Sequence, residues 1–298
     1  MAAVEVRDLA VSYGDVRAVD GITFEIAEGE FFGILGPNGA GKTTTLELVE
    51  GLRRPERGTV RLLGASPWPR NPTLLPRIGV QLQTSAFFER LTAREQLHTF
   101  AALYAVTPGR ADDWLDRVGL SEKAEARTED LSGGQAQRLA IACALVHEPE
   151  LVFLDEPTAA LDPQARRNLW DLLSGLNDSG RTVVLTTHYM DEAEVLCDRV
   201  AIMDHGKILQ LDAPDALVRG LDAPVRISVG SQLTREDAGA IPDVDDVRLE
   251  DGTLTLTTRA PAKVLQELAA RDSLEGLQVR GATLEDVFLE LTGREYRA

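Results

Sequence analysis

Residues 31–44 read FFGILGPNGAGKTT. The first five residues form an apolar run, which predicts a buried strand. Residues 36–43 match the pattern G-x-x-x-x-G-K-[ST], in which glycines let backbone N–H groups turn inward around a phosphate. Residues 43–49 predict a helix, whose N-terminal end favours an anion. This order of strand, loop and helix indicates a bound nucleotide, but kinases, GTPases and many ATPases share the loop.

Two further segments narrow the interpretation. Residues 131–135 read LSGGQ and precede an apolar-periodic helix, so they predict a second anion site at a helix N-terminus. Residues 151–157 read LVFLDEP, an apolar strand that ends in Asp155 and Glu156. Ligands of open α/β sheets bind at the carboxyl ends of the strands. An isolated buried charge there would be costly, so Asp155 indicates a bound cation such as Mg²⁺.

These three segments, in this order, resemble the nucleotide-binding subunit of an ATP-binding cassette (ABC) transporter. The resemblance covers most of residues 1–215. It implies an α/β P-loop NTPase cassette with an antiparallel β subdomain and a helical subdomain at about residues 87–130. It also implies an enzyme that binds ATP with Mg²⁺ and hydrolyses the ATP.

The resemblance assigns a role to each motif residue. Lys42 bridges the β- and γ-phosphates, and the Thr43 hydroxyl ligates Mg²⁺. Asp155 holds the ion through water, and Glu156 is the general base that orients or deprotonates the attacking water. The residues that it places along the phosphates are Gly36, Pro37, Asn38, Gly39, Ala40, Gly41, Lys42, Thr43 and Thr44.

Four single residues follow from their positions within the family's motifs. Gln83 matches the glutamine that touches Mg²⁺ or the attacking water and relays to the membrane partner. His188 matches the switch histidine that contacts the γ-phosphate, and Asp162 matches the dimer-contact loop. Tyr13 matches the aromatic residue that stacks on adenine, since a ring is a sequence-tolerant stacking platform.

The second anion loop implies a pair of subunits. It comprises Ser132, Gly133, Gly134 and Gln135. One chain cannot easily wrap both loops around one γ-phosphate. The resemblance implies a head-to-tail dimer in which Lys42 of one subunit and Ser132 of the other enclose the same ATP; homodimer and heterodimer both remain open. Ala136 and Ala160 depart from common family residues, which bears on the turnover rate and not on the class.

Composition restricts the partners. Of 298 residues, 31 are basic and 48 acidic, which gives a net charge of −17. Such a surface repels a phosphate backbone, so we expect no nucleic acid as the main partner. No apolar stretch is long enough to span a membrane, and the N-terminus lacks the pattern of a signal peptide. We therefore expect a cytoplasmic protein that is peripheral on the membrane through a separate permease subunit.

The two cysteines, Cys143 and Cys197, lie in apolar-periodic segments and are expected to be buried free thiols without a structural metal. Elsewhere in the cassette, alternation over the first 30 residues predicts antiparallel strands. Thr92 and Glu95 form a capping-box pattern ahead of a helix. Its apolar stripe, which includes Phe100 and Tyr104, is expected to pack internally.

Residues 222–298 predict a second, accessory domain for dimerisation or regulation. The order β-α-β-β-α-β fits a ferredoxin-like unit, with a hairpin turn at Asp251-Gly252 and a strand at about 274–279. An amphipathic helix follows at 284–291. Residues 282–288, ATLEDVF, resemble the tail of the drug- and antibiotic-exporter (daunorubicin-resistance-type) branch of the family, so we expect export.

Two alternatives remain beside the transporter. Soluble ABC-type ATPases act on nucleic acid or ribosomes, but they usually carry a coiled-coil or zinc insertion or a second cassette. A regulatory subunit that binds ATP without hydrolysing it is disfavoured by Glu156 and His188. The sequence does not name the cargo, because the permease selects it.

Overall fold

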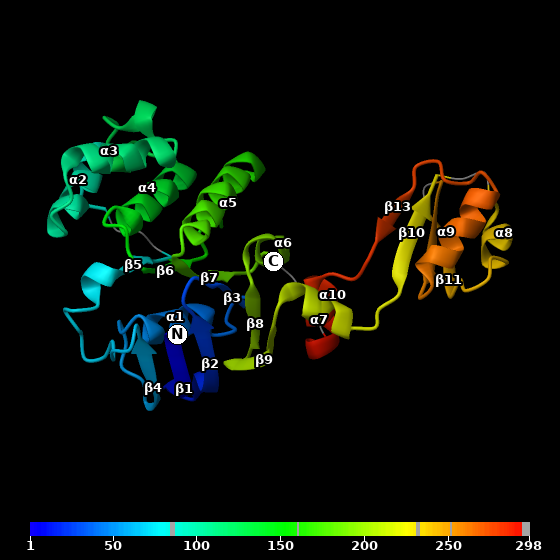
Figure 1. Cartoon of the computed structure of the whole chain (residues 1–298), viewed down its shortest axis with the longest axis horizontal. Coiled ribbons are helices and arrows are strands. Elements are labelled where there is room, and N and C mark those ends of the chain that lie inside the picture. Colours follow the sequence, from blue (N-terminus) through cyan, green and yellow to red (C-terminus); the bar gives the residue numbers. More distant parts are fainter. Residues whose placement is uncertain (84–86, 160, 231–232, 251, 294–298) are drawn as a thin grey trace. The chain divides into compact units, whose positions relative to one another are not determined.

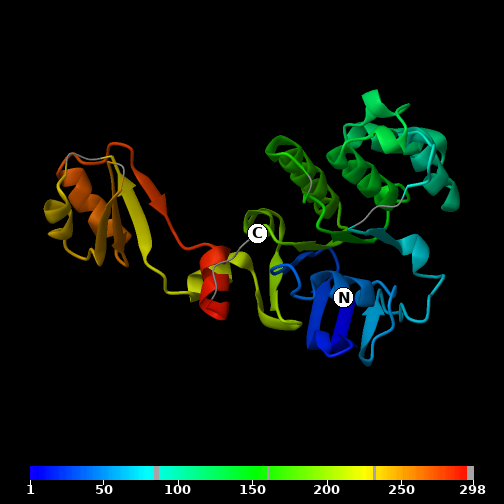
Figure 2. The ribbon, with the colours of Figure 1, turned by 180° about the vertical axis from the view of Figure 1, so that it is seen from behind.

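The computed structural model describes residues 1–83, 87–159, 161–230, 233–250 and 252–293. The chain divides into two compact units, and the division lies between Pro214 and Asp215. Figures 1 and 2 show the ribbon from opposite sides. Within the described residues, no helix is long and apolar enough to cross a membrane.

A six-stranded sheet forms the centre of the first unit, with the strand order β5-β6-β7-β3-β8-β9. Its strands are β3 (Phe31–Leu35), β5 (Ile78–Gln81), β6 (Leu151–Asp155), β7 (Thr182–Thr187), β8 (Arg199–Asp204) and β9 (Lys207–Asp212). All neighbours are parallel except the pair of β8 and β9. Every residue of β3, β6 and β7 is buried, as their apolar runs predicted. The segments after β3, β5, β6 and β7 therefore leave the sheet at one edge.

A smaller antiparallel sheet contains β1 (Ala2–Tyr13), β2 (Val16–Ala27) and β4 (Arg57–Leu62), in the order β2-β1-β4. This confirms the antiparallel strands predicted from the alternation. Helix α1 (Lys42–Val49) contacts strands of both sheets, and its Leu46, Leu48 and Val49 join their common core. Gly41, just before α1, has φ 102°, and a Cβ there would lie 2.2 Å from the Ala18 carbonyl oxygen. Only glycine fits this turn into the helix.

Helices α2 (Ala93–Leu103), α3 (Pro108–Arg117) and α4 (Gly133–Leu145) lie together in both views (Figures 1 and 2). The capping box before α2 is confirmed: Glu95 N–H donates to Thr92 Oγ1 at 3.2 Å, and Thr92 N–H donates to Glu95 Oε2 at 2.9 Å. Part of the predicted stripe packs differently from expectation. Phe100 and Tyr104 are half-buried and line a cavity, because β5 and α4 leave space beside them.

Two more helices flank the end of β7, namely α5 (Pro163–Asp178) and α6 (Met190–Leu196). Residue 160, where the sequence departs from the family pattern, lies outside the described residues. Cys143 and Cys197 are buried free thiols, as predicted. Burial raises the pKa of the Cys143 thiol to about 12.

The second unit has its own sheet, ordered β11-β12-β10-β13 with every pair antiparallel. Its elements are α7 (Pro214–Gly220), β10 (Val225–Val229), α8 (Arg235–Gly239), β11 (Asp246–Glu250), β12 (Thr253–Thr258), α9 (Pro261–Ala270), β13 (Gln278–Arg280) and α10 (Leu284–Thr292). Buried residues of β10, β12 and α9 form a separate core, including Ile227, Leu256 and Leu268. The order from β10 to β13 is the predicted β-α-β-β-α-β, and the ferredoxin-like assignment stays a prediction.

The last strand of this unit differs from its prediction, and part of the predicted hairpin turn lies outside the described residues. The last strand is shorter than the expected 274–279, because Leu277 N–H donates to the Leu274 carbonyl oxygen in a turn and Gly276 takes φ 66°. Asp251 of the predicted hairpin turn lies outside the described residues. The final helix α10 is present, with Thr283 N–H donating to Asp286 at its start and Gly293 at its end.

Candidate functional site

The phosphate-loop pattern leaves β3 at the carboxyl edge of the large sheet and ends in α1. Gly39 and Gly41 both have positive φ angles, 82° and 102°. A Cβ at Gly36 would lie 2.3 Å from the Met203 carbonyl oxygen, so this position also requires glycine. The turn after β8 supports the loop, because Gly206 N–H donates to the Ala40 carbonyl oxygen at 2.9 Å. The backbone is therefore preset in the shape that cradles a phosphate.

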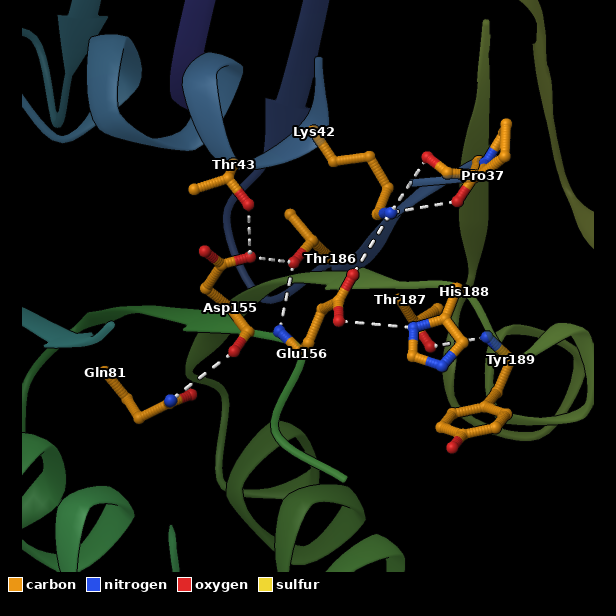
Figure 3. A network of polar contacts seen from close by, with 11 residues as sticks. Pro37, Lys42, Thr43, Gln81, Asp155, Glu156, Thr186, Thr187, His188 and Tyr189 are labelled. Carbon is orange, nitrogen blue, oxygen red and sulfur yellow. Dashed lines mark hydrogen bonds and ion pairs between the residues drawn. The ribbon is translucent and has the colours of Figure 1, made fainter. Parts of the chain in front are cut away.

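Lys42 and Glu156 form the centre of a buried polar network (Figure 3). Lys42 Nζ lies 3.1 Å from Glu156 Oε1, and the two side chains are only 4% and 8% exposed. The same ammonium donates to the carbonyl oxygens of Gly36 at 2.9 Å and Pro37 at 3.3 Å. A buried cation is stable only with such partners. The charge of Lys42 from the loop and the charge of Glu156 at the strand end therefore neutralise each other.

His188 completes the arrangement around Glu156. It directly follows β7, and its Nδ1 lies 3.2 Å from Glu156 Oε2. The backbone there is held by Tyr189 N–H, which donates to Thr187 Oγ1 at 2.9 Å. The two carboxylate oxygens of Glu156 therefore face two different basic groups, which orients the side chain across the end of the sheet (Figure 3).

Asp155 points to the other side of the same strand end. Its Oδ1 accepts a hydrogen bond from Thr43 Oγ1 at 3.2 Å and another from Thr186 Oγ1. Burial raises the pKa of Asp155, and the hydrogen bonds from Thr186 and Thr43 offset this only in part. Thr186 also accepts from Glu156 N–H at 3.0 Å, so one hydroxyl positions both acids. The apolar strand pattern of β7 did not single out this threonine.

A cavity of about 650 Å³ opens over the loop. Its lining residues are Tyr13, Val16, Arg17, Ala18, Asn38, Gly39, Gly41, Lys42, Thr43, Thr44, Gln83, Glu156 and His205. The cavity thus gathers nine residues that the sequence singled out, from Tyr13 of β1 to Glu156 after β6. Arg17 and His205 were missed, because they come from β2 and the turn between β8 and β9, which carry no nucleotide-binding pattern.

Tyr13 lies at the cavity with a partly exposed ring, and the Arg53 guanidinium lies 5.0 Å from the centre of that ring. Gln83 is exposed and lines the same cavity. The neighbouring Gln81 is buried, and its Nε2 donates to the carbonyl oxygens of Leu82 at 2.6 Å and Asp155 at 3.4 Å. Gln81 therefore anchors the end of β5 to β6 and leaves Gln83 facing the open space.

The residues 132–135 and Asp162 are not among those that line this cavity. Ser132 Oγ accepts from Gln135 N–H at 3.3 Å, and Gln135 Oε1 accepts from Ser132 N–H at 2.9 Å, which caps α4. Asp162 caps α5 by accepting from the N–H groups of Gln164 and Ala165 at 3.0 and 2.9 Å. Within one chain, the two predicted anion loops therefore do not share a cavity.

Comparisons with known proteins agree with this geometry. The ABC transporter family matches residues 19–159. The chain is 39% identical to the Nod factor export ATP-binding protein I of Sinorhizobium fredii over 99% of this chain and 87% of that protein. It is 40% identical to the protein of the same name from Paraburkholderia xenovorans, over 99% of this chain and 98% of that protein.

Solved structures give the same result for the fold. The ATP-binding subunit of an ABC transporter has a TM-score of 0.67 at 28% identity, and covers 73% of this chain and 92% of its own. A dimeric post-hydrolysis state of the ATP-binding cassette MJ0796, bound to ADP and Pi, has a TM-score of 0.65 at 29% identity, covering 70% and 98%. The predicted family, α/β fold and ATPase class are confirmed. The chain therefore belongs to the ABC transporter family, as one of its ATP-binding, ATP-hydrolysing subunits.

Proposed function

We propose that the cavity over the phosphate loop binds ATP with Mg²⁺, and that Glu156 is the general base of hydrolysis. The observation that carries this proposal is the position of the Glu156 carboxylate, 3.1 Å from Lys42 and 3.2 Å from His188 beside the cavity. A carboxylate beside a phosphate loop is placed to activate a water molecule once the phosphates have taken over its Lys42 partner.

Thr43 and Asp155 fit a magnesium ion. Their oxygens are 3.2 Å apart, and Mg²⁺ in proteins takes one or two carboxylates together with substrate phosphates and water. The burial that raises the pKa of Asp155 also makes a cationic partner favourable there. When bound, the ion would neutralise charge on the β- and γ-phosphates.

The ion pair between Lys42 and Glu156 must break when ATP enters, and an ion pair between Lys42 and the phosphates replaces it. In this proposal the phosphates take over the Lys42 ammonium, which releases one oxygen of Glu156. That oxygen then accepts a proton from the attacking water, while His188 contacts the γ-phosphate and Gln83 approaches the same region. A positioned base contributes about 10²–10⁴-fold to the rate.

Replacing Glu156 by Gln tests this role. The variant should bind ATP with nearly unchanged affinity and lose most of its turnover, by about 10²-fold or more, because an amide does not accept the proton. Calorimetry measures the affinity and phosphate release measures the turnover. Glu150→Gln is the matched control, since Glu150 is exposed, directly precedes β6 and pairs with Arg77. Near-normal turnover of Glu156→Gln would contradict the general-base assignment.

We also propose that two cassettes pair head to tail. Ser132 at the start of α4 and Asp162 at the start of α5 do not line the cavity of their own chain, and a homologous cassette is known as a dimer after hydrolysis. Pairing would bring Ser132 of one chain to the ATP on Lys42 of the other. The Glu156→Gln variant should then accumulate as an ATP-held dimer in size-exclusion chromatography.

The transport partner is proposed to be a separate membrane permease, and the direction of transport to be export. The relatives that align over nearly the whole chain are named as export ATP-binding proteins. We place the chain on the cytoplasmic face of the membrane, where ATP is present. The alternative of a soluble ATPase that acts on nucleic acid or ribosomes is not favoured by these relatives.

An apolar cavity of about 360 Å³ between β5, α2 and α4 supports a docked partner. Its lining includes the exposed Leu82 and the buried Glu50, whose carboxylate oxygens have no hydrogen-bond partner in the described part of the chain. An apolar surface with an unpaired acid at its base suits an apolar segment that carries a donor or cation.

Leu82→Glu tests the docking of the permease at this cavity. A charge at Leu82 should abolish copurification of a membrane protein from detergent extracts, while the ATPase activity of the isolated chain stays within about twofold because Leu82 lies outside the polar network. Leu103→Glu is the matched control, since Leu103 is 73% exposed and does not line the cavity. Equal recovery of the membrane protein with both variants would exclude docking at this cavity.

A further inference from the structure

A stack of three side chains leads away from His188, outside the nucleotide cavity. The ring of Tyr189 lies 4.2 Å from the imidazole of His188, tilted by 40°. On Tyr189 lies the guanidinium of Arg166, with Cζ 3.9 Å from the ring centroid. Arg166 belongs to α5, so the stack joins that helix to the end of β7. Figure 3 shows Tyr189 beside His188 and, beyond it, Glu156.

The ring of Tyr189 is in direct contact with the Arg166 guanidinium. The buried Nε of Arg166 has no hydrogen-bond partner among the described residues. The charge of Arg166 also acts on the buried Glu192 carboxyl, where it partly offsets the rise in pKa that burial causes. A guanidinium over an aromatic face is attracted by the ring quadrupole, and Arg stacks there better than Lys because it is planar. The ring of Tyr189 therefore lies between Arg166 and His188, where its orientation depends on both neighbours.

The packing of the two helices does not depend on this stack alone. One turn after Arg166, Trp170 Nε1 donates to Glu192 Oε1 at 3.1 Å, and Glu192 is completely buried in α6. The backbone of Tyr189 is held separately by Thr187. Removing the guanidinium or the ring should therefore leave α5 and α6 joined, and should change the freedom of the His188 ring instead.

The other end of the stack reaches the loop that contains Asp162. Asp162 caps α5, and Arg166 N–H donates to the Asp162 carbonyl oxygen at 2.9 Å in the first turn. Each residue in the series Asp162, Arg166, Tyr189, His188 and Glu156 therefore contacts the next one. A shift of the first turn of α5 would move the guanidinium on the ring that supports His188.

We propose that Arg166 and Tyr189 are positioning residues, which hold the His188 imidazole toward Glu156 and link its position to the start of α5. This inference rests on the proposed roles of Glu156 and His188 in hydrolysis. Catalytic groups act efficiently only within small errors of position, and those limits depend on supporting contacts of this kind. Neither residue lines the nucleotide cavity, so each acts through His188.

The test compares turnover with nucleotide affinity in four variants. Tyr189→Ala and Arg166→Ala should lower kcat by roughly tenfold while the Kd for ATP stays within about twofold, because the phosphate-loop contacts remain. Tyr189→Phe should restore kcat to within about twofold of the wild type, since the ring and not the hydroxyl makes the stack. Arg167→Ala is the matched control, an exposed arginine on the same helix.

Thermal unfolding separates positioning from a loss of structure, because Arg166→Ala removes only a half-buried side chain and keeps α5 intact. A kcat close to that of the wild type in both alanine variants would overturn the inference, and so would a Tyr189→Phe variant as slow as Tyr189→Ala. Glu156→Gln is measured in parallel. Normal turnover there contradicts the general-base proposal, whereas normal turnover in the two alanine variants contradicts only the positioning role.

Discussion

Glu156 adopts a backbone conformation that few residues other than glycine take, with φ 48°. Its N–H donates to the backbone oxygen and the side-chain oxygen of Thr186, which hold the strained turn in place. The turn aims Asp155 and Glu156 in different directions, toward Thr43 and toward Lys42. Strain that is maintained by surrounding contacts is common at functional sites, and here it separates the two adjacent acids.

At the same scale, Tyr13→Ala should weaken ATP binding by about 1–3 kcal/mol, with a smaller effect on kcat, because a ring face supplies stacking and does not take part in the chemistry. The Arg53 guanidinium near the ring should help to hold it in place. GTP should bind nearly as well as ATP, since a ring face does not recognise the edge of a base. Calorimetry checks the affinities. An unchanged Kd for Tyr13→Ala would show that this residue only packs, and Tyr13→Phe is the control that keeps the ring.

Among the elements, α1 connects the cavity over the phosphate loop with the apolar cavity beside β5. It begins at Lys42 in the phosphate loop and ends at Val49, and the next residue is Glu50, whose buried carboxyl lines the apolar cavity. Burial raises the pKa of Glu50 well above its ordinary value of 4.5, and the charges of Asp155 and Glu47 raise it further. The proposed phosphate-binding end of this eight-residue helix is thus joined to an acid at the other end that is protonated over a wider pH range than usual.

This pKa predicts how stability depends on pH. From about pH 4.5 up to the raised pKa, the folded chain keeps the Glu50 proton that the unfolded chain has lost, so Glu50 lowers the free energy of unfolding as the pH rises. The variant Glu50→Gln has no such proton. Its free energy of unfolding in urea should therefore improve relative to the wild type between pH 5 and pH 8. Glu122→Gln, at an exposed position, is the control; a constant difference between Glu50→Gln and wild type would exclude the burial effect.

At the scale of the whole molecule, each of the two compact units contains a hydrophobic cluster of its own. One combines both sheets and α1 in the first unit, and the other lies between β10, β12 and α9 in the second unit. All residues that line the nucleotide cavity, from Tyr13 to His205, precede the division at Pro214. The cavity over the phosphate loop and the second unit are therefore encoded in consecutive parts of the chain.

A chain that ends at Pro214 should still bind ATP with a Kd within about twofold of the full chain, because the complete cavity and its core are retained. We propose that the second unit helps two subunits to stay paired, so the shortened chain should be more monomeric without nucleotide or less well coupled to its permease. Analytical ultracentrifugation and a transport assay with the permease measure these two effects. Unchanged nucleotide-free dimerisation together with unchanged transport would contradict a role of the second unit in pairing or coupling.

Local sequence patterns predicted much of the fold. Apolar runs identified β3 and β6, and the capping residue Thr92 marked the start of α2, because burial and capping depend on neighbours within a few residues. The strand that the sequence predicted at 274–279 was too long, since the pattern of alternating residues did not show the turn at Gly276. Phe100 and Tyr104 were expected inside the packing and instead line a cavity, which depends on distant elements.

The motifs alone were enough to point to the phosphate-loop pattern, the two acids at the end of β6 and the family to which the chain belongs, because each motif is a short run whose chemistry depends on adjacent residues. Contacts between distant segments required the folded chain. The sequence did not predict that Lys42 and His188 share the two oxygens of Glu156, that His205 lines the cavity, or that Arg166 lies on Tyr189. These contacts depend on how parallel strands align at one edge of a sheet and on how helices pack beside it, and no local pattern records that alignment.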